Sequence, residues 1–238
     1  MITAVLLALS LAAAANVRPV LLELKAELET VAGERIDIQF GATGTLARQI
    51  QNGAPFDLFL AADEASVASL AKEGHLEAAT VRCYAVGALA VVAASDAGFA
   101  LPAKLDRQTA PAFSALPFRR LALASPKLAP YGRAAEEVLR TAGIEDSVRA
   151  RVVHAENVDQ ALTFVSSGNA EIGIVSLSEA LRTSLSRAPV DPSLYAPIRQ
   201  FAATVTGSSH REAARRVLNA LTGKAARPVW ERSGYSVP

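Results

Sequence analysis

Short apolar strands alternate with amphipathic helices through most of this chain, and this alternation restricts its fold more than any other feature. After Asn16, apolar residues recur at three- and four-residue steps from Val17 to Val31, which predicts a helix that ends at Gly33. The next segment, "RIDIQF", alternates as a strand does, and further strands and helices follow in turn. Strands that alternate with helices predict an α/β fold with mostly parallel sheets.

The predicted elements fall into two stretches, separated by residues 95–118, which are rich in Pro, Ala and Ser and have no firm pattern. The run "AVGALAVVAA" (85–94) lacks polar alternation and is typical of one strand buried on both faces. Further strands are predicted at 9–15, 56–62, 119–125, 148–155, 170–178 and 198–207, and further helices at 46–51, 63–74, 133–143, 156–168 and 210–223.

Four strand-to-helix junctions share small residues, a hydroxyl or amide side chain, and the start of a helix. They are "AAAAN" (12–16), "GATGT" (41–45), "APYGR" (129–133) and "AENVD" (155–159). Ligands of such sheets bind beyond the carboxyl ends of the strands, where the free N–H groups of helix N-termini favour anions. Two junctions lie in the first third of the chain and two in the middle third, which predicts two lobes facing each other across a cleft.

The second junction contains no lysine, histidine or carboxylate. An anion there would be met by neutral donors alone. We therefore expect Gly41, Thr43 and Gly44 to hold unpaired hydrogen-bond donors toward a bound anion.

The overall charge gives no support for a nucleic-acid or acidic membrane partner. Lys plus Arg number 24 and Asp plus Glu number 23, so the net charge is +1. The single cysteine, Cys83, excludes an intramolecular disulfide within this sequence and a zinc site built from cysteines.

Candidate catalytic groups are isolated from one another. No G-x-S-x-G, H-E-x-x-H or Walker lysine motif is present. His75 and His210 are expected to be solvated or capping residues, whereas His154 ends a predicted strand close to a junction. Asp57 and Asp63 flank a strand, where they are expected to cap helices or bridge lobes. An enzyme is therefore poorly supported.

Several longer segments resemble one known family. "TGTLARQIQNGAPFDLFLAADE", "SPKLAPYGRAAEEVLRTAG", "AENVDQALTFVSSGNAEIGIV" and "ERSGYSVP" are similar to the periplasmic molybdate-binding proteins of molybdate ABC transporters, over residues 9–238. The resemblance implies a type II periplasmic-binding-protein fold, in which two α/β lobes are joined by two crossover strands. It places lobe I at 1–83 and 198–238 and lobe II at 84–197.

The resemblance also implies a function. Such a protein captures molybdate or tungstate in the interlobe cleft and delivers it to the membrane permease of an ABC importer. It is not an enzyme, uses no cofactor and has no direct metal-cation site, because molybdenum is bound as its oxyanion. A periplasmic location follows from the family, and we expect a monomer with no nucleic-acid partner.

The implied ligand residues fall on the four junctions. The family's Ser or Asn after the first strand corresponds to Asn16, with Ala15 before it as a weaker candidate. The family's serine at the second junction corresponds to Thr43, which keeps the hydroxyl and adds a methyl group. Backbone N–H groups are implied at Tyr131 and at Val158.

Two further points follow from the resemblance. Some members carry a ligand-binding tyrosine where this chain has Ser176, whose shorter side chain makes it a weaker candidate. The N-terminal "MITAVLLALSLAAAAN" can be interpreted as a signal peptide without a basic segment or as a buried first strand. The match to the family's first strand favours the strand.

Three alternatives stay open at this point. A receptor for sulfate or thiosulfate would have the same fold. The effector-sensing domain of a transcriptional regulator would also have two lobes, but no helix-turn-helix segment precedes residue 16. An enzyme related to porphobilinogen deaminase would need a reactive cysteine or an acid pair in the cleft, and Cys83 is a poor fit.

Overall fold

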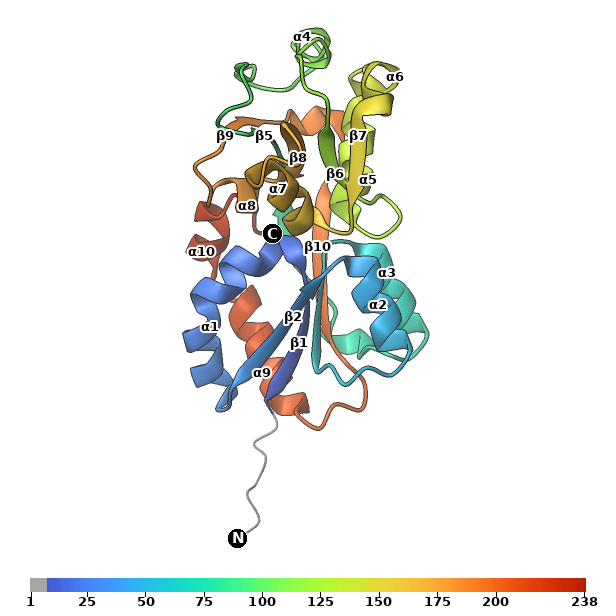
Figure 1. Cartoon of the computed structure of the whole chain (residues 1–238). Helices are drawn as coiled ribbons and strands as arrows, with labels where there is room; N and C mark the ends of the chain where they lie inside the picture. Colours follow the sequence, from blue (N-terminus) through green and yellow to red (C-terminus); the bar gives the residue numbers. More distant parts are fainter. Residues whose placement is uncertain (1–7) are drawn as a thin grey trace.

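The computed structural model describes residues 8–238, which form two lobes that lie one above the other in Figure 1. Each lobe is built around a five-stranded sheet, with strand order β2-β1-β3-β10-β4 in lobe I and β7-β6-β8-β5-β9 in lobe II. In each sheet four strands run in one direction, and one strand, β10 in lobe I and β5 in lobe II, runs antiparallel to them. The predicted two-lobed α/β fold is confirmed.

In lobe I, β1 pairs in parallel with β2 and β3, and β10 pairs in antiparallel with β3 and β4. Helices cover both faces of this sheet: one face packs Leu21, Val217 and Trp230, and the other packs Leu46 and Phe59. The elements are β1 (Leu9–Ala14), α1 (Arg18–Ala32), β2 (Ile36–Gly41), α2 (Thr43–Gln51), β3 (Leu58–Ala61), α3 (Glu64–Lys72), β4 (Arg82–Gly87), β10 (Ile198–Thr204), α9 (Arg211–Thr222) and α10 (Arg227–Arg232).

Lobe II repeats this arrangement: β6 pairs in parallel with β7 and β8, and β5 pairs in antiparallel with β8 and β9. Its cores lie on the two faces of the sheet, around Val138 and Ala161 respectively. The elements are β5 (Leu89–Ala93), α4 (Ala110–Ser114), β6 (Leu121–Ala124), α5 (Pro130–Thr141), α6 (Glu145–Val148), β7 (Val152–Ala155), α7 (Val158–Ser166), β8 (Ile172–Ser176), α8 (Leu177–Ala180) and β9 (Ser186–Pro189).

The single long strand predicted at 85–94 is wrong. Residues 82–87 and 89–93 form β4 and β5, which belong to different sheets, so the chain crosses between the lobes at Ala88. A hydrophobic run does not distinguish one long buried strand from two short ones, because both are buried on both faces. The lobe boundary expected after residue 83 falls inside β4.

Two helices begin earlier than predicted, and both changes affect the site. Helix α2 begins at Thr43 rather than at Leu46, and α5 begins at Pro130 rather than at Arg133. Their first turns consist of residues with low intrinsic helix propensity, or of a proline, which is well suited to the first helical position. In this chain glycine and proline therefore lie in the first turns of helices, although both residues are more typical of loops.

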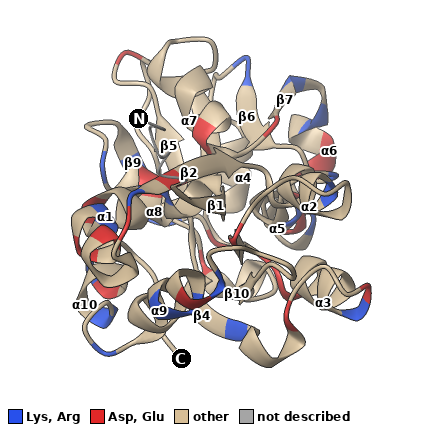
Figure 2. Cartoon of the chain, turned by 90° about the horizontal axis from the view of Figure 1, so that it is seen from below, with Lys and Arg blue, Asp and Glu red and all other residues tan. Residues whose placement is uncertain are grey.

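The first strand is confirmed for residues 9–14, whereas residues 1–7, which carry the rest of the signal-peptide interpretation, lie outside the described part of the chain. Within residues 8–238, none of the helices has the length and apolar character that a membrane span requires. Figure 2 shows residues of both charge signs interspersed over the outer helices, while the central strands are largely uncharged.

Candidate functional site

All four predicted junctions meet at one small cavity between the lobes. The space within it that the centre of a water molecule can reach is about 10 Å³, which is close to the room that one water molecule needs and far too little for a sugar or an amino acid. None of the lining residues is charged. They are Ala14, Ala15, Asn16, Gly41, Ala42, Thr43, Ala62, Ala129, Pro130, Tyr131, Asn157 and Val158.

Lobe I contributes a hydroxyl and an amide to this cavity. Thr43 is buried at the first position of α2, and its Oγ1 accepts the N–H of Ala62 at 3.0 Å. Because that hydroxyl is engaged as an acceptor, its own proton can be donated to an atom in the cavity. Asn16 lies in the 3₁₀ turn Ala15–Val17 that follows β1, and 1% of it is exposed. Ala15 brings only its backbone, since it has no polar side chain.

Lobe II contributes the first turns of two helices. Pro130 and Tyr131 open α5, and the extended backbone of Ala129 leads into it. Asn157 caps α7, with its Oδ1 accepting the N–H of Gln160 at 3.0 Å. No acceptor within residues 8–238 engages the backbone N–H groups of Tyr131 and Val158. Each helix start adds a partial positive charge to the cavity wall.

Gly44 does not fit the expectation of an unpaired donor. Its N–H donates to the carbonyl oxygen of Leu128 in the opposite lobe at 2.9 Å. Its role is therefore to hold the lobes together at the edge of the cavity, and Thr43 is the residue of this turn that offers a donor. Gly41 lines the cavity at the end of β2, where an added Cβ would come into contact with Leu46 at 3.4 Å.

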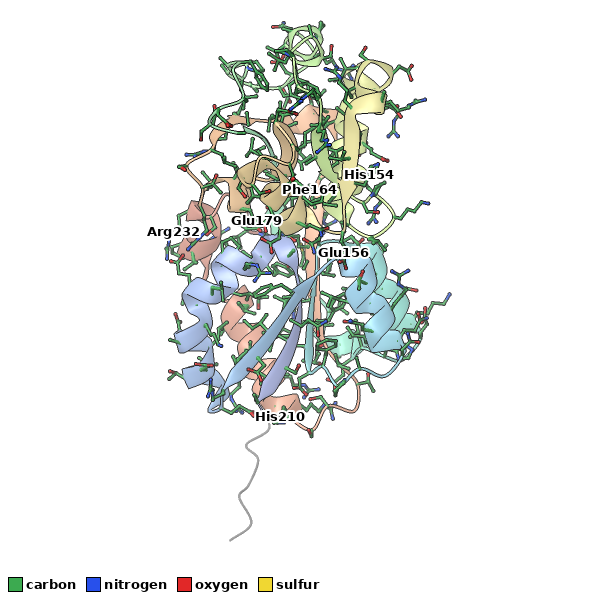
Figure 3. The ribbon with its side chains drawn as sticks, in the orientation of Figure 1. His154, Glu156, Phe164, Glu179, His210 and Arg232 are labelled. Atoms are coloured by element: carbon green, nitrogen blue, oxygen red, sulfur yellow. The ribbon has the colours of Figure 1, made fainter. Side chains whose placement is uncertain are left out.

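Charged residues bridge the lobes around the cavity but not within it. Arg18 Nη2 lies 2.9 Å from Asp159 Oδ2, and Arg133 pairs with Asp63. Asp63 also caps α3 by accepting the N–H of Ser66, so it both caps a helix and bridges the lobes as predicted. Figure 3 shows Glu156 at the same boundary, and its carboxylate accepts the Thr45 hydroxyl at 3.4 Å.

A buried hydrogen-bond network lies behind Asn16. Asn16 Nδ2 donates to Gln200 Oε1 at 2.8 Å and to the hydroxyl of Tyr235 at 3.0 Å. Gln200 Nε2 donates to the hydroxyl of Tyr131 at 3.1 Å, and the hydroxyl of Tyr84 donates to Gln200 Oε1 at 2.9 Å. Burial raises the pKa of Tyr131 and of Tyr84 well above the ordinary value, so both hydroxyls stay neutral.

The sequence analysis missed Gln200. It lies on β10, the crossover strand by which the chain returns from the lobe II sheet to the lobe I sheet, and none of its surface is exposed. One signal could have found it. In "IRQFAAT" a single amide interrupts an apolar strand, and a buried amide needs partners for all of its donors and acceptors.

Ser176 lies at the end of β8 and does not line the cavity, which corrects its place among the candidates. Its side chain is too short to leave the strand end: it caps α8, and its hydroxyl donates to Glu179 Oε2 at 3.1 Å. Burial, together with the negative charge of Asp159, raises the pKa of Glu179 to about 8, against the opposing effects of Ser176 and Arg18. Figure 3 shows Glu179 where the two lobes meet.

The other titratable candidates lie elsewhere. His154 is exposed on β7 and lines a separate surface hollow with Glu136 and Arg149, so it does not reach the cavity. His210 lies at the base of lobe I in Figure 3, and its hydrogen bond with Glu34 raises its pKa. In the part of the chain that the structure describes, no three His, Cys, Asp or Glu residues are grouped as a metal ion would require.

Comparison with known proteins agrees with this architecture. Residues 9–236 match the family described as "Bacterial extracellular solute-binding protein". The molybdate-binding protein ModA of Azotobacter vinelandii is 36% identical, over 95% of this chain and 88% of the relative. The solved periplasmic molybdate-binding protein of that organism superposes with a TM-score of 0.86 at 29% identity, covering 97% of this chain and 99% of the other.

A more distant structure shares the fold alone. The sulfate-binding protein SubI of Mycobacterium tuberculosis is 18% identical, with a TM-score of 0.75 over 97% of this chain and 86% of its own. The matched family is one of binding proteins, which confirms the expectation that the chain is not an enzyme. The extent of these matches, over a fold whose four helix starts enclose one uncharged cavity, shows that the chain belongs to the bacterial extracellular solute-binding proteins, the family of ModA.

Proposed function

We propose that this chain binds molybdate in the interlobe cavity and delivers it to the membrane permease of an ABC importer. The observation that carries the proposal is the convergence of four helix or turn starts, with neutral polar groups only, on a cavity that no charged side chain lines. The proposed ligand donors are Asn16, the Thr43 hydroxyl, and the N–H groups of Tyr131 and Val158, with the backbone of Ala15 as a weaker one. The 36% identity to a molybdate-binding protein supports the choice of ligand.

The donor set favours an anion that carries no proton. Molybdate is a fully deprotonated tetrahedral dianion at neutral pH and only accepts hydrogen bonds. Phosphate at the same pH keeps a proton, which needs an acceptor such as a carboxylate. The cavity lining offers no carboxylate, so a bound phosphate would lose a hydrogen bond worth roughly 1–3 kcal/mol.

Sulfate is also free of protons, so size alone separates it from molybdate. The longer metal–oxygen bonds of molybdate require a wider ring of donors, and tungstate has nearly the same dimensions. We therefore propose that tungstate binds about as well as molybdate and that sulfate binds much more weakly. A general oxyanion receptor on the same fold is the alternative.

Closure of the lobes completes the site, because donors from lobe II are added to those of lobe I. The Gly44–Leu128 hydrogen bond and the Arg18–Asp159 and Arg133–Asp63 pairs form across the same boundary. A permease would then recognise the closed form, in which both lobes present fixed surfaces. We propose that the protein acts as a monomer in the periplasm, as its family membership suggests.

A thermal-shift titration with molybdate, tungstate, sulfate and phosphate at equal ionic strength tests the proposal. A ligand at 100 times its dissociation constant adds about 2.7 kcal/mol to the free energy of unfolding. Large shifts with molybdate and tungstate only are expected. Equal shifts with sulfate would instead indicate a general oxyanion receptor, and no shift with any of the four would overturn the proposal.

A further inference from the structure

Two buried side-chain amides, those of Asn16 and Gln200, lie next to each other at one wall of the cavity. Asn16 lines the cavity, while Gln200 lies behind it on β10 and is fully buried. Asn16 turns its Nδ2 away from the cavity, toward Gln200 Oε1 at 2.8 Å. Its Oδ1 accepts no hydrogen bond from any residue in the range 8–238. In this orientation the amide offers the cavity an acceptor, whereas a proton-free anion requires a donor.

Both amides can turn over together when a ligand accepts the Asn16 N–H groups, which now meet the hydroxyls of Tyr235 and Tyr131 at 3.0 and 3.4 Å. The Tyr235 hydroxyl does not donate to the turned Oδ1, because its own proton goes to the carbonyl oxygen of Asn16 at 2.6 Å. The nitrogen and oxygen of a terminal amide have nearly the same size, so a half turn changes polarity and leaves the packing unaltered. After both turn, Gln200 Nε2 donates to Asn16 Oδ1 and Gln200 Oε1 accepts from the hydroxyl of Tyr131. The hydroxyl of Tyr84 keeps an acceptor, because the carbonyl oxygen of Ala61 already lies 3.2 Å away.

We propose that Gln200 is a positioning residue for oxyanion binding, because it turns together with Asn16 and so lets Asn16 present Nδ2 to the ligand. This proposal rests on the proposed function. Glutamine suits the role because its side chain carries both a donor and an acceptor, which can be exchanged. Tyr131 links the arrangement to closure, since its hydroxyl contacts Gln200 from the opposite lobe at 3.1 Å while its N–H faces the ligand.

The backbone at Gly87 packs closely against the side chains of Gln200 and Tyr131. A Cβ at Gly87, on the other crossover strand, would lie 1.9 Å from the Tyr131 hydroxyl and 2.8 Å from Gln200 Nε2. Close packing on this side limits displacement of the Gln200 side chain, whereas a half turn of its amide needs no extra volume. Both crossover strands thus enclose the pair that sets the polarity of Asn16.

The decisive variant is Gln200→Glu, whose carboxylate only accepts hydrogen bonds. It is satisfied by Asn16 Nδ2 and by the hydroxyls of Tyr84 and Tyr131, so it holds Asn16 with Oδ1 toward the ligand. We expect molybdate affinity, measured by isothermal titration calorimetry, to fall about 100-fold. Gln39→Glu is the matched control, because it makes the same change on the exposed face of β2 and is expected to leave affinity unchanged.

The preference between molybdate and phosphate distinguishes a positioning role of Gln200 from the effect of the negative charge that Gln200→Glu adds. A buried negative charge weakens every dianion alike, whereas Asn16 Oδ1 held toward the cavity can accept the proton of hydrogen phosphate. In competition with molybdate, Gln200→Glu is therefore expected to reduce the preference for molybdate over phosphate at least 10-fold. Equal losses for both anions, or unchanged molybdate affinity, would overturn the proposal.

Gln200→Met provides a second test if Gln200→Glu does not fold, as judged by thermal unfolding without ligand. It removes both polar ends at similar volume and is expected to weaken molybdate about 10-fold. Wild-type affinity in this variant would also overturn the proposal. Wild-type protein titrated in parallel keeps the two hypotheses apart: failure of the wild type to bind molybdate contradicts the proposed function, and only a difference among variants bears on Gln200.

Discussion

The backbone N–H of Gly44 donates to the carbonyl oxygen of Leu128 at 2.9 Å, which joins the first turn of a lobe I helix to a loop of lobe II. The contact lies beside Thr43, a residue that lines the cavity. A Cβ added at Gly44 would lie 3.0 Å from the same carbonyl oxygen. Close approach of two backbones, rather than an unusual torsion angle, is therefore what favours glycine here.

Gly44→Ala is expected to weaken closure without weakening the fold. The methyl group pushes Leu128 away, so the closed form loses a contact that the open form does not need. We expect molybdate to dissociate about 5- to 10-fold faster in stopped-flow measurements. Thermal unfolding without ligand serves as the control and should not fall, because alanine is the better helix former. An unchanged dissociation rate would show that the contact does not contribute to closure.

Thr43→Val removes one hydroxyl that serves two partners. Ligand binding loses a donor, and the buried N–H of Ala62 loses its acceptor. We expect the free energy of unfolding and the molybdate binding free energy each to decrease by about 1–3 kcal/mol. Thr43→Ser keeps the hydroxyl and should retain binding. If Thr43→Val bound as tightly as wild type, Thr43 would not be a ligand residue.

Asn157 allows the charge of the cavity wall to be changed while a helix cap is preserved. Asn157→Asp keeps an oxygen that caps α7, so the free energy of unfolding should change by less than about 0.5 kcal/mol. The new carboxylate would lie against a dianion, and we expect affinity to fall at least 10-fold, more at low salt than at high salt. Asn157→Ala, by contrast, should cost about 1 kcal/mol of stability. Calorimetry at two ionic strengths, with urea unfolding in parallel, distinguishes the two effects.

Glu179 is expected to make stability depend on pH. Its pKa is about 8 in the folded chain, against an ordinary value of 4.5, so the folded chain holds a proton that the unfolded chain has lost. The free energy of unfolding therefore falls as pH rises from about 4.5 to 8 and levels off above. Glu179→Gln should remove this loss and exceed wild type by about 2–4 kcal/mol at pH 9, with little difference at pH 4.5. Parallel pH profiles for the two proteins would contradict this assignment.

The sequence predicted the elements that carry a regular apolar period and missed those defined by contacts distant in the chain. The helix of residues 18–32, with Gly33 after it, and the cap Asp63 follow from local rules that tertiary packing did not override. The break at Ala88 was missed, because the two sheets that β4 and β5 join are recognisable only in three dimensions.

The candidate site was likewise predicted where it depends on local sequence and missed where it depends on contacts between distant parts of the chain. The four junctions could be predicted to meet, since the carboxyl ends of parallel strands lie at one edge of a sheet. That Gly44 would bind Leu128, and that Ser176 would face Glu179, depend on how the lobes pack and on the exact end of β8. Gln200 was missed because its side-chain partners, Asn16, Tyr84 and Tyr131, come from three distant segments of the chain.

Two of the four proposed donors are main-chain N–H groups, at Tyr131 and Val158. Almost any amino acid supplies such a group, so substitution of these side chains removes no donor. The side chains at these two positions can therefore change without loss of the main-chain N–H groups that would bind the ligand. Recognition through these groups depends on the course of the backbone rather than on the identity of the side chains, so a search for invariant side chains would overlook part of what selects the ligand.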